Sequence, residues 1–120
     1  MNTEYLRDQD KISTIDGTIT CDAVDRAKCQ VDFGFGVPGD YRVVSTDYIT
    51  YAIVYSCSQS VRNYGSANPV DLVWILSRKE TLSDKEKARA LQIIKERLPA
   101  YDTRQLVWSK QGGDCKYYNN

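Results

Sequence analysis

The sequence predicts an all-β domain with one helix. Its first two-thirds alternates apolar and polar residues with a period of two, as antiparallel strands do. One amphipathic helix follows, and a short strand-like segment comes after it. The chain has 120 residues, of which 42% are hydrophobic, so residues 1–120 are sized for a single domain. We therefore expect about six antiparallel strands joined in hairpins, then one helix, then one more strand.

The expected strands are separated by polar or glycine-rich segments. Residues 22–28 predict a turn, and residues 34–39 and 58–69 predict longer loops. The segment 71–77 is apolar on both faces, so another element must cover its outer side. The segments with strand-like alternation, or with β-branched and aromatic composition, are residues 15–20, 29–33, 41–45, 51–57 and 71–77.

A capping box predicts where the helix begins. Ser83 is followed three residues later by Glu86, and Pro99 predicts the end of the helix. The apolar side of this helix should cover the outer side of the segment 71–77, and a last strand is expected over Gln105–Trp108. The apolar residues that recur at helical spacing are Ala90, Leu91, Ile94 and Leu98.

The charge balance and the absence of histidine exclude several functions. Sixteen basic and 16 acidic residues give a formal net charge of zero, whereas phosphate binding relies on clustered positive charge. Without histidine, the chain cannot form a Ser-His-Asp triad, a Cys-His dyad or a histidine-ligated metal site. No apolar run is long enough to span a membrane. We therefore predict that the protein is not an enzyme, with no catalytic or metal-binding residues and no nucleic-acid partner.

Two local patterns resemble functional motifs but have simpler explanations. Gly34-x-Gly36-x-x-Gly39 matches the dinucleotide fingerprint, whose glycines work only when a helix N-terminus follows to receive the pyrophosphate. Here Pro38 lies inside the pattern and a strand follows it. Asp22 and Asp25 could act as paired carboxylates, but between two strands they are expected to be solvated turn formers.

The cysteines bear on the cellular compartment. Cys21, Cys29, Cys57 and Cys115 include no CxxC pair, which argues against a zinc site. An even count in a short chain suits disulfides and an oxidising environment. The alternative is four buried free thiols in a cytosolic protein. The first residues have no basic-then-apolar signal stretch, so a secreted protein would carry its signal upstream of Met1.

Two longer stretches resemble the lipocalins, specifically the branch of apolipoprotein D and the insect bilin-binding proteins. Residues 46–57 read TDYITYAIVYSC and residues 74–78 read WILSR, which are similar to that family's second and third signature regions. Residues 15–20 and 31–33 match its fourth and fifth strands in order and spacing. The resemblance covers nearly the whole chain. It implies an up-and-down antiparallel β-barrel with the helix packed on the outside before the last strand.

The chain departs from the family pattern at its N-terminal end. The family's first signature, a Gly-x-Trp on strand one, is missing, as are strands one and two and most of strand three. The resemblance therefore implies a lipocalin-type barrel that is incomplete at the N-terminus, because such a barrel closes when its last barrel strand pairs with strand one. Arg78 resembles the arginine that packs across the strand-one tryptophan in the family.

The resemblance also bears on the cysteines. In this branch, the partners of Cys57 and Cys115 lie on the absent segment, which leaves both without their family partners. Cys21 and Cys29 are additional, and they bracket the turn 22–28, so a disulfide between them is reasonable if the two strand ends face each other. The family is secreted, and we expect an extracellular protein.

The family implication for function is a cup that carries one small hydrophobic molecule: a lipid, retinoid, steroid, bilin or carotenoid. No cofactor is implied with certainty, although a bound bilin, carotenoid or lipid would fit the resemblance. The alternative for the expected ligand-binding residues is that they fill a closed core. These residues lie on one face of their strands, and they are Val31, Phe33, Tyr41, Val43, Leu72, Trp74 and Leu76.

Two other function classes remain open from the sequence. An incomplete barrel leaves strand edges unpaired, so the chain could be a structural or interaction protein completed by a partner chain or by a homodimer. A lipocalin-type isomerase is the third class, but its nucleophilic cysteine sits on an early strand that this chain lacks.

Overall fold

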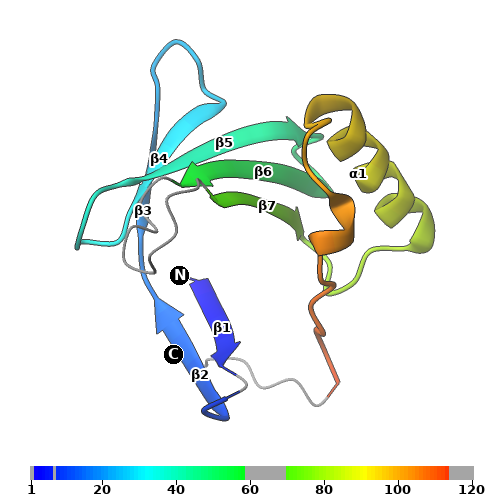
Figure 1. The fold of residues 1–120 in the computed structure, drawn as a ribbon, viewed down its shortest axis with the longest axis horizontal. Coiled ribbons are helices and arrows are strands. Elements are labelled where there is room, and N and C mark those ends of the chain that lie inside the picture. Colours follow the sequence, from blue (N-terminus) through cyan, green and yellow to red (C-terminus); the bar gives the residue numbers. More distant parts are fainter. Residues whose placement is uncertain (1, 7, 59–69, 114–120) are drawn as a thin grey trace.

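A computed structural model describes residues 2–6, 8–58 and 70–113, and within them the chain forms seven strands, one α-helix and one short 3-10 helix (Figure 1). The predicted loop 58–69 lies almost wholly outside the described residues, as does Cys115. The elements in chain order are β1 (Asn2–Leu6), β2 (Lys11–Ile15), β3 (Thr18–Cys21), β4 (Lys28–Asp32), β5 (Gly39–Thr46), β6 (Tyr51–Ser58), β7 (Val70–Ser77), α1 (Asp84–Arg97) and η2 (Thr103–Gln105).

The strands form two antiparallel sheets. Strands β3 to β7 make a five-stranded sheet in which each strand pairs with its neighbour in sequence, and β1 pairs with β2 as a separate hairpin. Figure 1 shows the larger sheet arching over this hairpin, with α1 against its other side. The prediction of an antiparallel fold with a single helix is confirmed for the described residues. The sheet does not close, as expected for a barrel that is incomplete.

The tightest packing lies between α1 and the sheet. Ile53 and Ile94 are completely buried, and Ala90 and Ile93 are nearly so. Val73 and Ile75 pack against this cluster, as the apolar segment 71–77 predicted, and so do Val44, Tyr51, Leu98, Tyr101 and Leu106. We call the face that packs on α1 the outer face of the sheet and the opposite face the inner face. The predicted helix residues Ala90 and Ile94 are in the buried cluster, and Leu98 packs against it. Leu91 lies outside the cluster and is only half-buried, and Ile93 is buried in its place.

The start of α1 is the predicted capping box. The Ser83 hydroxyl accepts from the Glu86 backbone N–H at 3.2 Å, and the Glu86 carboxylate accepts from the Ser83 backbone N–H at 2.7 Å. The two bonds satisfy backbone donors that the first helical turn would otherwise leave unpaired. The helix ends at Arg97, two residues before Pro99.

The prediction of a last strand over Gln105–Trp108 is wrong. Gln105 ends the 3-10 helix η2, and the residues after it have no ladder partner among the described strands. The Asp102 carboxylate caps η2 by accepting from the Arg104 backbone N–H at 3.0 Å. A short alternating segment becomes a strand only when another strand lies beside it.

A glycine marks the break between the hairpin β1–β2 and the larger sheet. The predicted strand 15–20 is interrupted at Asp16 and Gly17, so that β2 and β3 belong to different sheets. A Cβ atom at Gly17 would lie 2.8 Å from the Phe33 ring. The ring therefore packs directly on the backbone of the break, which only glycine permits. Phe33 itself follows the end of β4, so its predicted place within the strand is wrong by one residue.

The turn 22–28 forms as expected. Asp22 Oδ1 accepts from the backbone N–H groups of Val24 and Asp25, both at 2.8 Å, and Asp25 Oδ1 accepts from the Ala27 N–H at 3.2 Å. The bonds to Asp25 and Val24 lower the pKa of Asp22. Both aspartates are turn formers, as predicted.

The two strand ends that flank this turn face each other, and Cys21 pairs with Cys29 across β3 and β4. The two residues form a disulfide, which confirms the predicted pairing. Cys57 is a free cysteine within the part of the chain that the structure describes.

Candidate functional site: the inner face of the sheet

The inner face of the five-stranded sheet is built almost entirely of apolar side chains. Side chains alternate between the two faces of a strand, and residues paired across neighbouring strands point to the same face. Because Val73 and Ile75 pack on α1, Trp74 and the residues paired with it lie on the face away from α1. The register places Val43, Val54 and Trp74 in one row, and Thr46, Ala52 and Leu76 in another. The other inner-face residues are Ile19, Cys21, Cys29, Val31, Tyr41, Ser56 and Leu72.

The charged residues of these strands all lie on the other face. On β4, Cys29 and Val31 face inward, so the neighbouring Lys28, Gln30 and Asp32 point outward. On β7, Leu72 faces inward, so Asp71 points outward. The charged residues of β3 to β7 are Lys28, Asp32, Asp40, Arg42 and Asp71, and every one of them takes an outward position. The sheet therefore separates charge from apolar surface, as a wall does between solvent and a binding cavity.

The structure brings most of the predicted ligand-binding residues together on this face. Leu72, Trp74 and Leu76 follow one another along β7 and are 39%, 40% and 44% exposed. Val31, Tyr41 and Val43 are half-buried farther along the same face. A row of large apolar side chains this exposed is unusual on a soluble surface without a partner.

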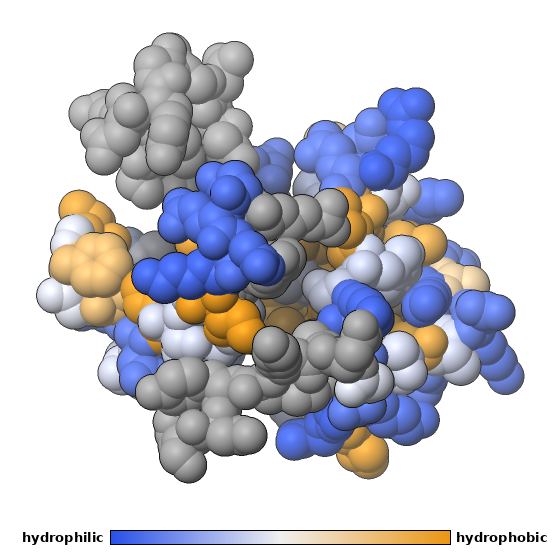
Figure 2. All heavy atoms as spheres, turned by 90° about the horizontal axis from the view of Figure 1, so that it is seen from below, coloured by the Kyte–Doolittle hydropathy of each residue, from blue (hydrophilic) through white to orange (hydrophobic). Residues whose placement is uncertain are grey.

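Phe33 lies apart from the other predicted residues. It sits at the end of β4, with its ring over Gly17 and its centroid 6.5 Å from that of Phe35. It borders the inner face at the β2–β3 break. Figure 2, which views the molecule from below, shows hydrophobic residues gathered between hydrophilic ones.

Sequence reasoning missed two central residues of this face. Val54 and Ser56 lie on β6, between the predicted residues of β5 and β7, and they are 1% and 5% exposed. The segment 51–57 carries apolar residues on both faces, so it has no apolar–polar alternation that tells one face from the other. The pairing register of the strands could have identified them. Alternation identifies the inner residues of β5 and β7, and β6 lies between these two strands.

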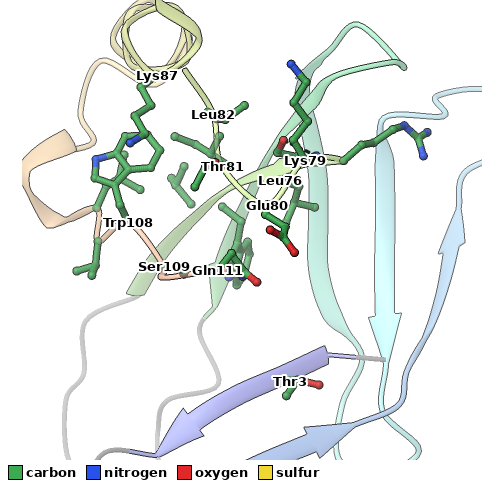
Figure 3. A pocket seen from close by; sticks show the side chains of 17 residues that line it. Thr3, Leu76, Lys79, Glu80, Thr81, Leu82, Lys87, Trp108, Ser109 and Gln111 are labelled. Atoms are coloured by element: carbon green, nitrogen blue, oxygen red, sulfur yellow. Dashed lines mark hydrogen bonds between the residues drawn. The ribbon is translucent and has the colours of Figure 1, made fainter. Parts of the chain in front are cut away.

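A pocket of about 560 Å³ opens at one end of this face. It lies between β7, the β7–α1 connection, the segment that follows η2, and Thr3 of β1 (Figure 3). Trp74 and Leu76 line it, so it is continuous with the apolar row of β7. Trp108 lines its other side. Its volume lies within the usual range for small-molecule sites.

The charged residues around this pocket have partners of their own. The Lys79 ammonium lies 3.5 Å from the Glu86 carboxylate on α1, and the Lys87 ammonium lies 5.1 Å from the centre of the Trp108 ring. The Arg78 guanidinium donates to the Tyr48 carbonyl at 3.3 Å. Glu80 brings a negative charge to the pocket, where its carboxylate approaches the backbone of Gly112. In Figure 3 the Lys87 side chain extends from α1 toward Trp108.

The two faces differ in their titratable groups as well. Desolvation raises the pKa of inner-face Tyr41, so its hydroxyl stays protonated at neutral pH. On the outer face the Tyr55 hydroxyl donates to Asp71 at 2.8 Å, and this bond raises the pKa of Tyr55. Arg42 forms an ion pair with Asp40 at 3.0 Å on that same outer face.

No group of three His, Cys, Asp or Glu residues with the geometry of a metal site occurs among the residues that the structure describes. No helix in the same residues is long and apolar enough to cross a membrane.

Comparison with known proteins identifies the family. The family model of the lipocalin-like domain matches residues 1–111. The chain belongs to the lipocalin-like domain family. The narrower resemblance to apolipoprotein D and the bilin-binding proteins stays a prediction.

Two solved structures share the fold of this lipocalin-like domain. Lobster apocrustacyanin A1 superimposes with a TM-score of 0.71 at 22% identity, and apocrustacyanin C1 with a TM-score of 0.71 at 23% identity. In each case the match covers 94% of this chain and 59% of the other. The lipocalin-like domain thus spans well under two-thirds of the length of the crustacyanin chains that it matches.

Proposed function

We propose that this chain binds and carries a small hydrophobic molecule on the inner face of its sheet, within residues 1–120 as a single lipocalin-like domain. One observation carries the proposal: all charged residues of β3 to β7 point outward, while Leu72, Trp74 and Leu76 remain exposed on the inner face. The lipocalin family as a whole supports a binding role rather than catalysis. The ligand-binding residues are Val31, Phe33, Tyr41, Val43, Leu72, Trp74 and Leu76, to which we add Val54 and Ser56.

Burial of the ligand accounts for useful affinity. Micromolar binding corresponds to about −8 kcal/mol. At about −0.3 kcal/mol per atom, a molecule of roughly 20–30 heavy atoms supplies about −6 to −9 kcal/mol, a range that includes this value. Retinoids, steroids, bilins and carotenoids are in or above this size range, and long-chain lipids lie near its lower edge. No cofactor beyond such a ligand is proposed.

Tryptophan fluorescence tests this proposal. Titration with a panel of fatty acids, retinoids, steroids and bilins should change the emission of Trp74, because the exposed indole loses water when the face is covered. Trp108 lines the same end pocket, so two single-tryptophan variants are needed. Trp108→Phe should keep the ligand signal, and Trp74→Phe should lose most of it.

The outcome that contradicts the carrier proposal is equally direct. If no member of the panel binds at high micromolar concentration while circular dichroism shows a folded protein, the inner face is not a ligand site. If the ligand signal survives Trp74→Phe and disappears with Trp108→Phe, the ligand binds beside the segment after η2 and not along the β7 row.

A second candidate function rests on the strand edges. Among the described strands, β7 pairs only with β6, and β1 pairs only with β2. An eight-residue edge with apolar inward residues is a template for another strand. A partner chain or a second copy that adds a strand there would complete the barrel. Size-exclusion chromatography with light scattering separates the candidates: a ligand-free monomer at all concentrations would count against this one.

The disulfide supports a location outside the cytosol. Such bonds persist in oxidising compartments, and lipocalins are typically secreted. We therefore propose that the protein is extracellular, which localisation of a tagged full-length protein in its own cells would test.

A further inference from the structure

Two hydroxyl-bearing residues, Tyr41 of β5 and Ser56 of β6, are cross-strand neighbours on the inner face. Arg42 pairs with Tyr55 in the β5–β6 register, so the next antiparallel step places Tyr41 opposite Ser56. Ser56 pairs in turn with Leu72 of β7. The two residues thus lie beside Leu72, at one end of the exposed row Leu72, Trp74 and Leu76. The third inner hydroxyl, that of Thr46, donates to the Tyr51 carbonyl at 2.7 Å and belongs to the β5–β6 turn.

We propose that the ligand of this face is an uncharged molecule bearing a hydroxyl or carbonyl group that hydrogen-bonds with Tyr41 and Ser56, and that carboxylate-bearing analogues are rejected. The inference rests on the proposed carrier function and narrows its ligand class. It separates alcohols and ketones of the retinoid, steroid and carotenoid type from fatty acids and bilins, which carry carboxylates.

The rejection of carboxylates follows from where the charges lie. An ionised carboxylate that enters an apolar wall loses its hydration, and this costs far more than one hydrogen bond returns unless a cation compensates it. The two cations of β4 and β5, Lys28 and Arg42, point to the outer face. A hydroxyl or carbonyl group loses much less hydration, and the hydroxyls of Tyr41 and Ser56 are chemically able to pair with it.

The charged end pocket is the competing place for a carboxylate head group. Its cations already have partners: Lys79 with Glu86, Lys87 with the Trp108 ring, and Arg78 with the Tyr48 carbonyl. Glu80 adds a negative charge that would repel a second carboxylate. The distribution therefore favours the neutral ligand over an anionic amphiphile with its head at this end.

Matched alcohol and acid pairs test the inference. Retinol with retinoic acid, and hexadecanol with hexadecanoic acid, are titrated against the full chain at neutral pH while tryptophan emission is followed. Each alcohol should bind on the order of tenfold or more tightly than its acid, because only the acid is ionised. As the pH falls toward the pKa of a carboxyl group, about 4.3, the affinity for the acid should approach the affinity for the alcohol measured at the same pH.

Variants on the two faces of the sheet locate the hydrogen bonds. Tyr41→Phe and Ser56→Ala should each weaken the binding of the alcohols by about two- to tenfold, the range of one neutral hydrogen bond. The matched outer-face changes Tyr55→Phe and Ser45→Ala should leave that affinity unchanged, since Tyr55 bonds to Asp71 and Ser45 bonds to Tyr51 on the other side.

The possible failures are distinguishable. If the acids bind as tightly as the alcohols at neutral pH, the neutral-ligand inference is overturned and the carrier function stands. The inference is also overturned, with the carrier function intact, if the inner-face and outer-face variants behave alike. If none of the four probes binds to the folded protein, the carrier function fails together with the inference.

Discussion

Val54 of β6 and Trp74 of β7 lie directly opposite each other on the inner face, yet Val54 is 1% exposed and Trp74 is 40% exposed. Val54 has Val43 of β5 on its other side, whereas β7 is the last strand of the sheet as described. Burial on this face is therefore deep at Val54 of β6 and falls off at both edge strands, where Trp74 of β7 is 40% exposed and Ile19 of β3 is 49% exposed. The exposed indole marks one open side from which a ligand or another strand can approach.

Truncating a helix side chain to alanine should lower the stability of the protein strongly at Ile94 and only mildly at Leu91. Ile94 is completely buried against Ile53, so Ile94→Ala leaves a cavity and should lower the free energy of unfolding by about 2–5 kcal/mol. Leu91 is half-buried outside that cluster, so Leu91→Ala should cost clearly less. Urea unfolding of the two variants measures both values. Equal losses would show that the helix docks through a different face.

The Cys21–Cys29 disulfide should stabilise the protein modestly. It closes a loop with a sequence separation of 8, for which loop-closure entropy gives about 2–3 kcal/mol at best. The double variant Cys21→Ser, Cys29→Ser should unfold at correspondingly lower urea concentration, and Cys57→Ser is the control. Peptide mapping without reductant should recover the linked pair. Two alkylatable thiols at these positions in protein from an oxidising compartment would contradict the assignment.

The turn between β5 and β6 should lose stability in acid. Asp47 accepts from the Thr50 hydroxyl and from the backbone N–H groups of Ile49, Thr50 and Tyr51, at 3.0, 2.7 and 3.1 Å for the backbone bonds. These bonds, the Thr50 hydroxyl first, lower the pKa of Asp47 in the folded state. Its contribution is therefore complete above the unfolded pKa, about 3.9, and is lost as the pH falls through the lower folded value.

Asp47→Asn isolates this effect. The asparagine amide keeps an acceptor oxygen but does not ionise, and a carboxylate accepts these hydrogen bonds more strongly than an amide does. The wild-type protein should therefore be more stable than the variant at neutral pH. The gap between the two urea midpoints should then shrink as the pH falls below about 3.9. Asp22, whose pKa is also lowered, remains in both proteins and cancels in the comparison. A gap that is constant with pH would mean that ionised Asp47 does not stabilise the turn.

Gly17 and Phe33 should behave as a coupled pair. In Gly17→Ala the new Cβ meets the Phe33 ring at 2.8 Å, so the ring must move and we expect a loss of about 1–3 kcal/mol. In a Phe33→Ala background the clash is gone, and the same glycine change should cost less. Urea unfolding of a double-mutant cycle measures the difference. Additive losses would show that the ring does not rest on Gly17.

The local elements of this protein follow from its sequence because short-range physics decides them. Ser83 and Glu86 identify the start of α1, since the capping box joins residues only three positions apart. Alternation identifies the inner positions of β4, β5 and β7, and the outward Val73 and Ile75 follow from the need to cover an apolar strand. The turn 22–28 and the pairing of Cys21 with Cys29 are local in the same sense.

Contacts between distant segments needed the tertiary structure. Val54 and Ser56 belong to the inner face because β6 lies between β5 and β7, which no periodicity within β6 reveals. Leu91 and Ile94 share one helix side in the sequence, but α1 docks on the sheet so that Ile94 is completely buried and Leu91 is half-exposed. The segment Gln105–Trp108 has the composition of a strand and remains unpaired, because a strand exists only where a neighbour supplies its hydrogen bonds.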